Sequence, residues 1–309
     1  YAWTERHLTD FWDDLAQLDP GKSHYTGVLT LESVPPTAHQ KWEEDAWIIS
    51  ARGYSPYYVV DGQQRLTTAL VLIQTILESA GTRSHLNLTP VADIRKKYVF
   101  ESKDDGISRS YLFGYEKDNP SYEHLKAVIF GEHSPTRRVI EETAYTSNLD
   151  FAKHFLKERV LGLDDDARDA LFRKVTQHLL FNLFTISDEV EVCVAFETMN
   201  NRGKPLSNLE LLKTRLVYLT IKLEADDADR QMMRRDINEC WKCIYHDLGS
   251  KKGFPLDDDE FLRAHTILFF GPKAVVAEAP LAHQGRDKLS DEAAESPEAA
   301  EEAFMDRAF

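Results

Sequence analysis

The sequence lacks several features that would place it in a familiar class of protein. It has no run of 18 apolar residues, and its first residues do not combine a basic region with an apolar stretch. We therefore expect neither a membrane span nor a signal peptide. No GxxxxGK[ST] motif occurs in the chain, which excludes a Walker A phosphate loop.

Cysteine is scarce, with three residues in a chain of 309. Three cysteines do not make an even disulfide framework, so we expect a soluble protein of the reducing cytoplasm. Cys240 and Cys243, in the stretch CWKC, have the spacing of a redox or zinc half-site. Because they fall inside a helical pattern and no second CxxC is present, we interpret them as small buried apolar residues.

Basic charge is also in deficit, with 37 Lys and Arg against 52 Asp and Glu and a net charge of −15. Such a balance argues against non-specific adhesion to nucleic acid or to an anionic membrane, although a local basic groove remains compatible with it. The basic pairs at 96–97, 137–138 and 251–252 form no stripe. We interpret them as solvated surface.

Apolar periodicity predicts an α+β protein with a small mixed sheet and a large helical addition. Apolar residues with Thr4 as cap predict a helix near the N-terminus, and strands are expected at 24–34 and 57–60 around a polar loop. A nearly all-apolar helix follows at 66–77. A third strand is expected at 179–187, and Ser207 with Glu210 forms a capping box for a helix to about residue 223.

These patterns divide the chain into four segments. We expect a core at 1–80, an inserted helical layer at 81–178, a return to the core with closing helices at 179–271, and an acidic linker or C-terminal helix at 272–309.

The stretch VVDGQQRLTT at 59–68 places a turn and several polar groups where a strand meets a buried helix. A turn with Gly62 that opens a helix presents free N–H groups and the positive end of the helix dipole to an anion. Arg65 would add a bidentate phosphate contact, and Asp61 would hold a divalent cation or accept a proton. Gln63 and Gln64 would orient a water or read a base edge. An Asp-Gly turn before a capped helix explains the same residues.

A second polar loop precedes the helix at 208. Asn200, Asn201, Arg202 and Lys204 bring amide, guanidinium and ammonium donors to another helix start, where an anion is again favoured. Two such helix starts suggest one ligand between them. The alternative is a polar turn between helices.

Other residues have simpler interpretations. The Asp runs at 164–166 and 257–259 are expected to cap helices rather than to bind cations. His24 and His265 are expected to be structural. Of the N-terminal aromatic residues, only Tyr1 and Trp3 are candidates for contact with a ligand such as a nucleobase or a modified DNA backbone.

The stretches VVDGQQRLTTALVLIQTI (59–76) and FETMNNRGKPLSNLELLKTRLV (196–217) together resemble the N-terminal domain of GmrSD-type and SspE-type modification-dependent restriction enzymes, which has a ParB-like and sulfiredoxin-like fold. The resemblance extends over roughly residues 1–271. In that family a first strand ends in Gln-Arg and continues into Tyr-x-Trp, so this strand would lie just before Tyr1 and Trp3.

The resemblance implies a cytoplasmic, anti-phage module that senses DNA modification and hydrolyses a nucleoside triphosphate, with GTP favoured and Mg²⁺ as cofactor. Residues 61–65 would form the catalytic nucleotide motif, with Asp61 on the metal, and Asn200, Asn201, Arg202 and Lys204 would line the same site. The implied partners are DNA, modified by phosphorothioate or on a base, and an HNH-type nuclease in the full-length chain or in a partner protein. A homo-oligomer is possible, and no membrane is involved.

Two other functions remain open from the sequence. The same pocket would serve a module that binds modified DNA or nucleotide without hydrolysis. A ParB-like nuclease is the second alternative, and the chain shows no recognisable metal cluster that would favour it.

Overall fold

The computed structural model describes residues 1–42, 44–103, 108–115, 119, 121–132, 143–186, 207–223, 225–250 and 256–271. Two compact units are present, Tyr1–Leu262 and Arg263–Phe309. The division of the chain into the four predicted segments stays a prediction.

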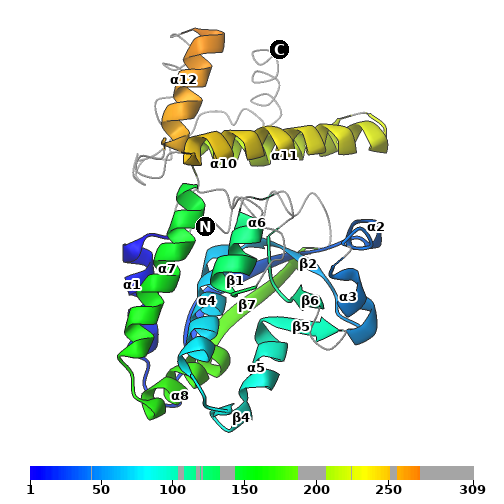
Figure 1. The fold of residues 1–309 in the computed structure, drawn as a ribbon. Helices are drawn as coiled ribbons and strands as arrows, with labels where there is room; N and C mark the ends of the chain where they lie inside the picture. The colour runs from blue at the N-terminus through cyan, green and yellow to red at the C-terminus, as the bar shows by residue number, and fades with distance from the viewer. Residues whose placement is uncertain are drawn as a thin grey trace, which may run out of the picture. The chain divides into compact units, whose positions relative to one another are not determined.

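A three-stranded mixed sheet carries the polar turn. The central strand β1 (His24–Ser33) pairs antiparallel with β2 (Tyr57–Asp61) and parallel with β7 (Leu179–Ile186), as Figure 1 shows. The third strand therefore returns to the sheet from far along the chain. All three strands were predicted, and the α+β fold with a helical addition is confirmed.

Helix α4 (Gln63–Ser79) is the centre of the core. Every residue from Thr67 to Leu77 in it is buried. The hydroxyl groups of Thr67, Thr68 and Thr75 each donate to the carbonyl four residues earlier, at 2.7–2.8 Å, so the buried polar atoms are satisfied within the helix. The start of α4 is thus held rigidly by the packing of the helix behind it.

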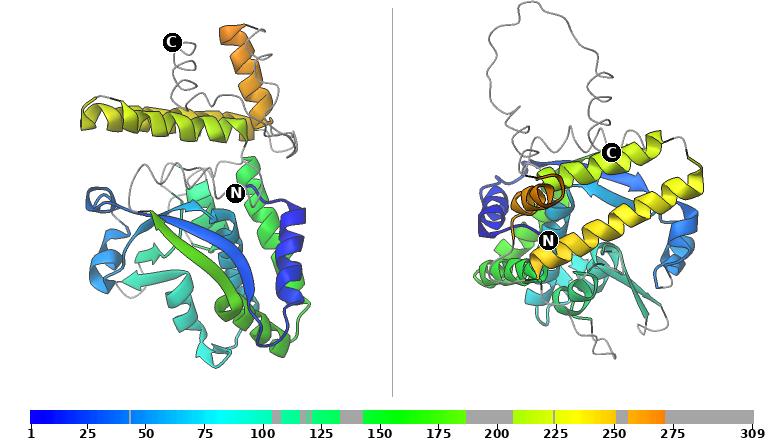
Figure 2. Two further views of the ribbon diagram at one scale, coloured as in Figure 1. Left: turned by 180° about the vertical axis from the view of Figure 1, so that it is seen from behind. Right: turned by 90° about the horizontal axis from the view of Figure 1, so that it is seen from above.

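Helix α7 links α4 to the N-terminal helix. It spans Ala144–Leu161, packs against α4 and also contacts α1 (Glu5–Ala16), and the left view of Figure 2 shows α1 beside α7. The predicted cap of α1 is present, because Thr4 and His7 form a reciprocal capping box. The buried residues of α1 are Leu8, Phe11 and Leu15. The amphipathic pattern of the N-terminal segment is therefore confirmed.

The prediction of a polar loop between β1 and β2 is wrong. This segment contains α2 (Pro36–His39) and α3 (Ala46–Arg52). The α3 helix is anchored by contacts with distant residues: Trp47 Nε1 donates to Ser110 Oγ at 2.5 Å, and Arg52 forms an ion pair with Glu101. Such tertiary contacts stabilise a helix that is too short to be predicted from its own sequence.

We expected the middle of the chain to be helical, but the structure shows that it also contains strands. Its helices are α5 (Val91–Tyr98), α6 (Ser121–His124) and α8 (Asp165–Arg173), with π-helical turns at Leu125–Ile129 and Lys174–His178. Its strands form two small antiparallel pairs: β3 (His85–Leu86) with β4 (Thr89–Pro90), and β5 (Phe100–Lys103) with β6 (Ser108–Tyr111). Short strands of mixed polarity lack the alternation that would reveal them.

Helices α10 (Asn208–Lys222) and α11 (Asp227–Gly249) pack through Leu209, Trp241 and Leu248, and α12 spans Asp258–Phe270. The predicted capping box is confirmed, because Glu210 N donates to Ser207 Oγ at 3.2 Å. The expected burial of the CWKC cysteines is wrong. Cys240 and Cys243 are both exposed, because Trp241 takes the buried face of α11.

The two acidic runs behave as caps. Asp164 accepts from Ala167 N at the start of α8, and Asp257 accepts from Glu260 N at the start of α12. Across the part of the chain that the structure describes, no helix has the length and apolar character to cross a membrane.

The difference in burial between Leu72 and Leu161 predicts that their substitution by alanine will change stability to different extents. Leu72→Ala in α4 removes a side chain that is 0% exposed and should lower the free energy of unfolding by about 2–5 kcal/mol. Leu161→Ala is the matched change at a helical leucine that is 59% exposed, and it should change the free energy of unfolding by no more than about 0.5 kcal/mol. Chemical denaturation measures both, and equal losses would contradict the assignment of α4 as the core helix.

Candidate functional site

The turn between β2 and α4 is built around Gly62. Its φ of 87° lies in the left-handed region, and a Cβ at this position would lie 2.9 Å from Val28 O. Only glycine fits this approach without strain. No side chain caps α4, and its first backbone bond runs from Leu66 N to Gly62 O. The preceding N–H groups of the helix therefore have no intrahelical acceptor, as at any helix start.

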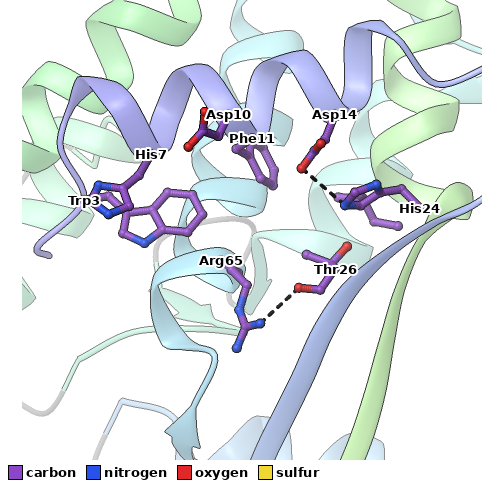
Figure 3. A pocket seen from close by; sticks show the side chains of 9 residues that line it. Trp3, His7, Asp10, Phe11, Asp14, His24, Thr26 and Arg65 are labelled. Carbon is purple, nitrogen blue, oxygen red and sulfur yellow. Dashed lines mark hydrogen bonds and ion pairs between the residues drawn. The ribbon is translucent and has the colours of Figure 1, made fainter. Parts of the chain in front are cut away.

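Arg65 ties the turn to the central strand. Its Nη1 donates to Thr26 O at 3.0 Å, and its Nη2 donates to Val28 O at 2.9 Å. Nη2 also lies 3.5 Å from Asp61 Oδ2. Figure 3 shows the guanidinium directed at the backbone of β1 beside Thr26. The predicted phosphate-binding arginine is thus engaged with protein oxygens at both terminal nitrogens.

A bulge in β1 makes this contact possible. The pairing with β7 passes from Tyr25 to Gly27 and skips Thr26, so the carbonyl of Thr26 is available to Arg65. Gly27 has a φ of 120°, and a Cβ there would lie 2.0 Å from Arg65 Nη1. The strand carries a glycine at this point because the guanidinium lies directly against its backbone.

The two glutamines of the motif have different surroundings. Gln64 Oε1 accepts a hydrogen bond from Ala2 N at 3.0 Å, so its side chain holds the N-terminal segment. Gln63 is exposed at the first position of α4, and its side chain has no hydrogen-bond partner among the described residues. Of the five residues from 61 to 65, Gln63 therefore offers the side chain most accessible to a ligand.

The two N-terminal aromatic residues, Tyr1 and Trp3, also differ in their surroundings. Tyr1 is 6% exposed, its hydroxyl lies 2.7 Å from Thr68 Oγ1, and burial raises the pKa of its phenol. In this arrangement Tyr1 belongs to the core and presents no surface to DNA. Trp3 is half-buried and stacks on His7, with ring centroids 5.9 Å apart. A contact of Trp3 with DNA stays a prediction.

Trp3 lines a hollow between α1 and β1, drawn in Figure 3. The volume of this hollow is about 160 Å³, and it is also lined by His7, Asp10, Asp14, His24 and Arg65. This volume is below the several hundred Å³ of ordinary ligand pockets, so a nucleoside triphosphate does not fit. His24 Nε2 lies 3.3 Å from Asp14 Oδ2 and links β1 to α1, which agrees with a structural role for this histidine.

A broader groove lies on the other side of the turn. Gln63, Leu66 and Leu70 of α4 line it together with β2, α3 and residues 111–115. The groove therefore reaches the exposed glutamine at the start of α4. A ligand bound at the turn would extend into this space rather than into the hollow.

The second polar loop lies outside the described residues. Asn200, Asn201, Arg202 and Lys204 fall between residues 187 and 206, so their expected place beside the turn stays a prediction. Within the described ranges, no group of three His, Cys, Asp or Glu side chains is placed to hold a metal ion.

The comparison with protein families finds a match over most of the chain. The model for the GmrSD restriction endonuclease, N-terminal domain, matches residues 1–217, a range that includes β1, β2, α4 and β7. The chain belongs to this GmrSD N-terminal domain family. The predicted resemblance is thereby confirmed, and a role in DNA restriction follows from the family. No curated protein matches the chain.

Sequence reasoning missed part of the GmrSD-type turn. It did not identify Thr26 and Gly27 as the cradle of Arg65, although an isolated glycine inside a strand pattern is a signal for a bulge or a close backbone approach. It also did not separate Gln64 from Gln63, because two adjacent residues of one type differ only through their tertiary contacts.

The Arg65 contact predicts a coupled pair of substitutions. Gly27→Ala should lower the free energy of unfolding by about 1–3 kcal/mol, through backbone strain and the clash with the guanidinium. Arg65→Ala should lower the free energy of unfolding by about 1–3 kcal/mol, because the part-buried carbonyls of Thr26 and Val28 lose this donor. The double variant should lose at least ~0.5 kcal/mol less than the sum, because the clash needs both residues.

Gly53→Ala is the control for the backbone term, because Gly53 has a φ of 66° and open space around it. Urea denaturation of the unaltered protein and of the four variants measures the coupling. Losses that add within ~0.3 kcal/mol would show that the guanidinium does not lie against Gly27 in solution.

Proposed function

We propose that the start of α4 binds the phosphates of a nucleoside triphosphate and that the chain hydrolyses it to regulate DNA cleavage in a restriction system. The observation that carries the proposal is the turn itself. Asp61 and the exposed Gln63 flank Gly62 at an uncapped helix start that opens onto a groove. Free N–H groups and the helix dipole favour a phosphate at this place.

The contacts of the motif support separate roles for its residues. Gln63 orients the attacking water, because its side chain is the accessible one. Arg65 and Gln64 hold the turn through their bonds with β1 and with Ala2. When a nucleotide binds, the remaining donors of Arg65 offset the phosphate charge. Asn200, Asn201, Arg202 and Lys204 complete the site from the second loop.

Mg²⁺ fits this turn only together with a nucleotide. Asp61 is the one carboxylate of the motif, and within the described ranges no cluster of three ligating side chains surrounds it. Magnesium is commonly held by one or two carboxylates and by phosphate oxygens, with water completing the shell. Asp61 would therefore hold an ion that neutralises charge on the bound phosphates. We propose GTP as the favoured substrate.

The family role in restriction supports DNA and a nuclease as partners. We propose that the module senses DNA that carries a phosphorothioate or a modified base, and that it governs an HNH-type nuclease in the same full-length chain or in a partner protein. Nucleotide hydrolysis switches a DNA-engaged state, and the module acts in the cytoplasm, where a homo-oligomer is compatible with these roles.

A binding module without hydrolysis is the second candidate. It is favoured by the engagement of Arg65, whose Nη1 and Nη2 both bond to carbonyls of β1, so that the turn has fewer groups for catalysis. A ParB-like nuclease has less support, because its metal-dependent chemistry would need a cluster of ligands that the described residues do not form.

The accessible glutamine provides the test. Gln63→Ala should lower phosphate release from GTP by roughly 100-fold, because the attacking water loses its orienting group. The melting temperature should not change, since the side chain is exposed. Asp61→Asn should abolish turnover by removing the carboxylate. Steady-state phosphate release with GTP, ATP, CTP and UTP in Mg²⁺, with and without modified DNA, gives the rates.

Gln17→Ala, at another exposed glutamine, is the matched control and should retain full turnover. Full turnover in Gln63→Ala would remove this residue from the mechanism. Nucleotide binding without phosphate release by the unaltered protein would establish the second candidate instead.

A further inference from the structure

The groove beside the turn has an aromatic wall. It is lined by Trp42, which lies between α2 and α3, and by Tyr54, Tyr57 and Tyr58, which lie on the segment from α3 to β2 that leads directly into the turn. Tyr54 and Tyr57 are 46% and 43% exposed. Trp42 and Tyr58 pack edge to face with ring centroids 6.4 Å apart, which fixes the orientation of both rings. Tyr54 and Tyr57 are therefore accessible, whereas Trp42 and Tyr58 are half-buried and hold each other in place.

A buried lysine faces the same groove. Lys126 lies on the π-helical turn Leu125–Ile129 and is 8% exposed. Its Nζ donates to Glu44 Oε2 at 2.8 Å and to Tyr122 OH at 2.6 Å. Burial lowers the pKa of Lys126, but the hydrogen bonds with Glu44 and Tyr122 outweigh it, and the pKa is raised overall. The ammonium is therefore charged at neutral pH.

These contacts leave Lys126 able to bind one more acceptor. An ammonium has three N–H donors, and Glu44 and Tyr122 accept two of them. A buried cation held by a carboxylate keeps its position while a third acceptor approaches from the groove. The groove thus combines flat apolar surfaces with a preoriented hydrogen-bond donor, as small-molecule pockets do.

We propose that this groove binds the nucleobase and ribose of the nucleotide whose phosphates lie at the start of α4. The base stacks on Trp42 and on the tyrosine rings of the α3–β2 segment, and Lys126 donates to an acceptor on its polar edge. Glu44 is a positioning residue, because it holds the ammonium without lining the groove. This inference rests on the proposed function and adds the residues that distinguish one base from another.

The phosphate and base subsites are separable by experiment. Isothermal titration calorimetry with Mg²⁺ compares the four nucleoside triphosphates with inorganic tripolyphosphate, which carries the phosphates but no base. Trp42→Leu should weaken binding of each nucleotide by roughly tenfold through lost stacking. Tripolyphosphate affinity should not change. Lys126→Met should also weaken nucleotide binding and change the order of preference among the four bases.

Glu44→Gln tests the positioning role without removing the lysine. It should produce a smaller loss than Lys126→Met and the same change in base preference. Lys153→Met is the matched lysine control, because Lys153 is also paired with a carboxylate, Glu78 at 3.0 Å, and does not line the groove. Tyr25→Ser controls for loss of an exposed aromatic ring outside the groove. Melting curves identify any variant that fails to fold, and Trp42→Leu and Glu44→Gln test the groove independently of Lys126→Met.

The outcomes separate this inference from the function on which it rests. Unchanged nucleotide affinity in folded Trp42→Leu and Glu44→Gln would overturn the groove assignment while the phosphate site stands. Absence of both nucleotide and tripolyphosphate binding in the unaltered protein would overturn the proposed function itself. Loss of binding to a modified DNA oligonucleotide, with nucleotide affinity intact, would assign the groove to DNA and contradict the proposal.

Discussion

The contact between Arg65 and the backbone of β1 is the constraint on which the candidate site depends. One guanidinium joins the first turn of α4 to two carbonyls of the central strand and approaches Asp61 at the end of β2. Three elements are thereby held in one geometry. The bulge at Thr26 and the glycine at position 27 exist in the strand at the point where this contact needs an unpaired carbonyl and room for the guanidinium.

Burial of α4 gives the same turn its rigidity. A helix whose residues 67–77 are all buried cannot shift without opening the core, so its first N–H groups point in a fixed direction. A polar site on the end of a buried helix is preorganised in this sense, because the cost of orienting the donors is met when the protein folds. Within the motif, Gln64 helps to hold the turn, whereas its neighbour Gln63 faces outward.

The surroundings of the turn limit what it can bind. The hollow on the α1 side is too small for a nucleotide, whereas the groove on the α3 side has aromatic walls and a buried lysine. The family supplies a role in restriction, and the phosphate site that we propose rests on the geometry of the turn alone. The short helix α3 is central to this arrangement, since the segment from it to β2 carries accessible aromatic rings.

Much of the fold followed from sequence because local patterns are short-range. The sequence predicted strands at β1, β2 and β7, the apolar run predicted α4, and capping residues predicted the starts of α1 and α10, all of which the structure confirms. Segment 36–52 was mistaken for a loop and the β5–β6 pair was missed, because tertiary contacts such as Trp47 with Ser110 stabilise them rather than their own periodicity. The cysteines of α11 were misplaced because a helical pattern alone does not say which face Trp241 will take.

The candidate site divides in the same way. The sequence by itself determined the Asp-Gly turn, the helix that follows it and the family to which the chain belongs, since all three are written in contiguous motifs. Only the tertiary structure decided that Arg65 bonds to β1, that Gln64 holds Ala2 while Gln63 remains exposed, and that Lys126 faces the groove. These assignments join residues 37 to 62 positions apart or place side chains on a surface shared by several elements, and such relations arise only when the chain is packed.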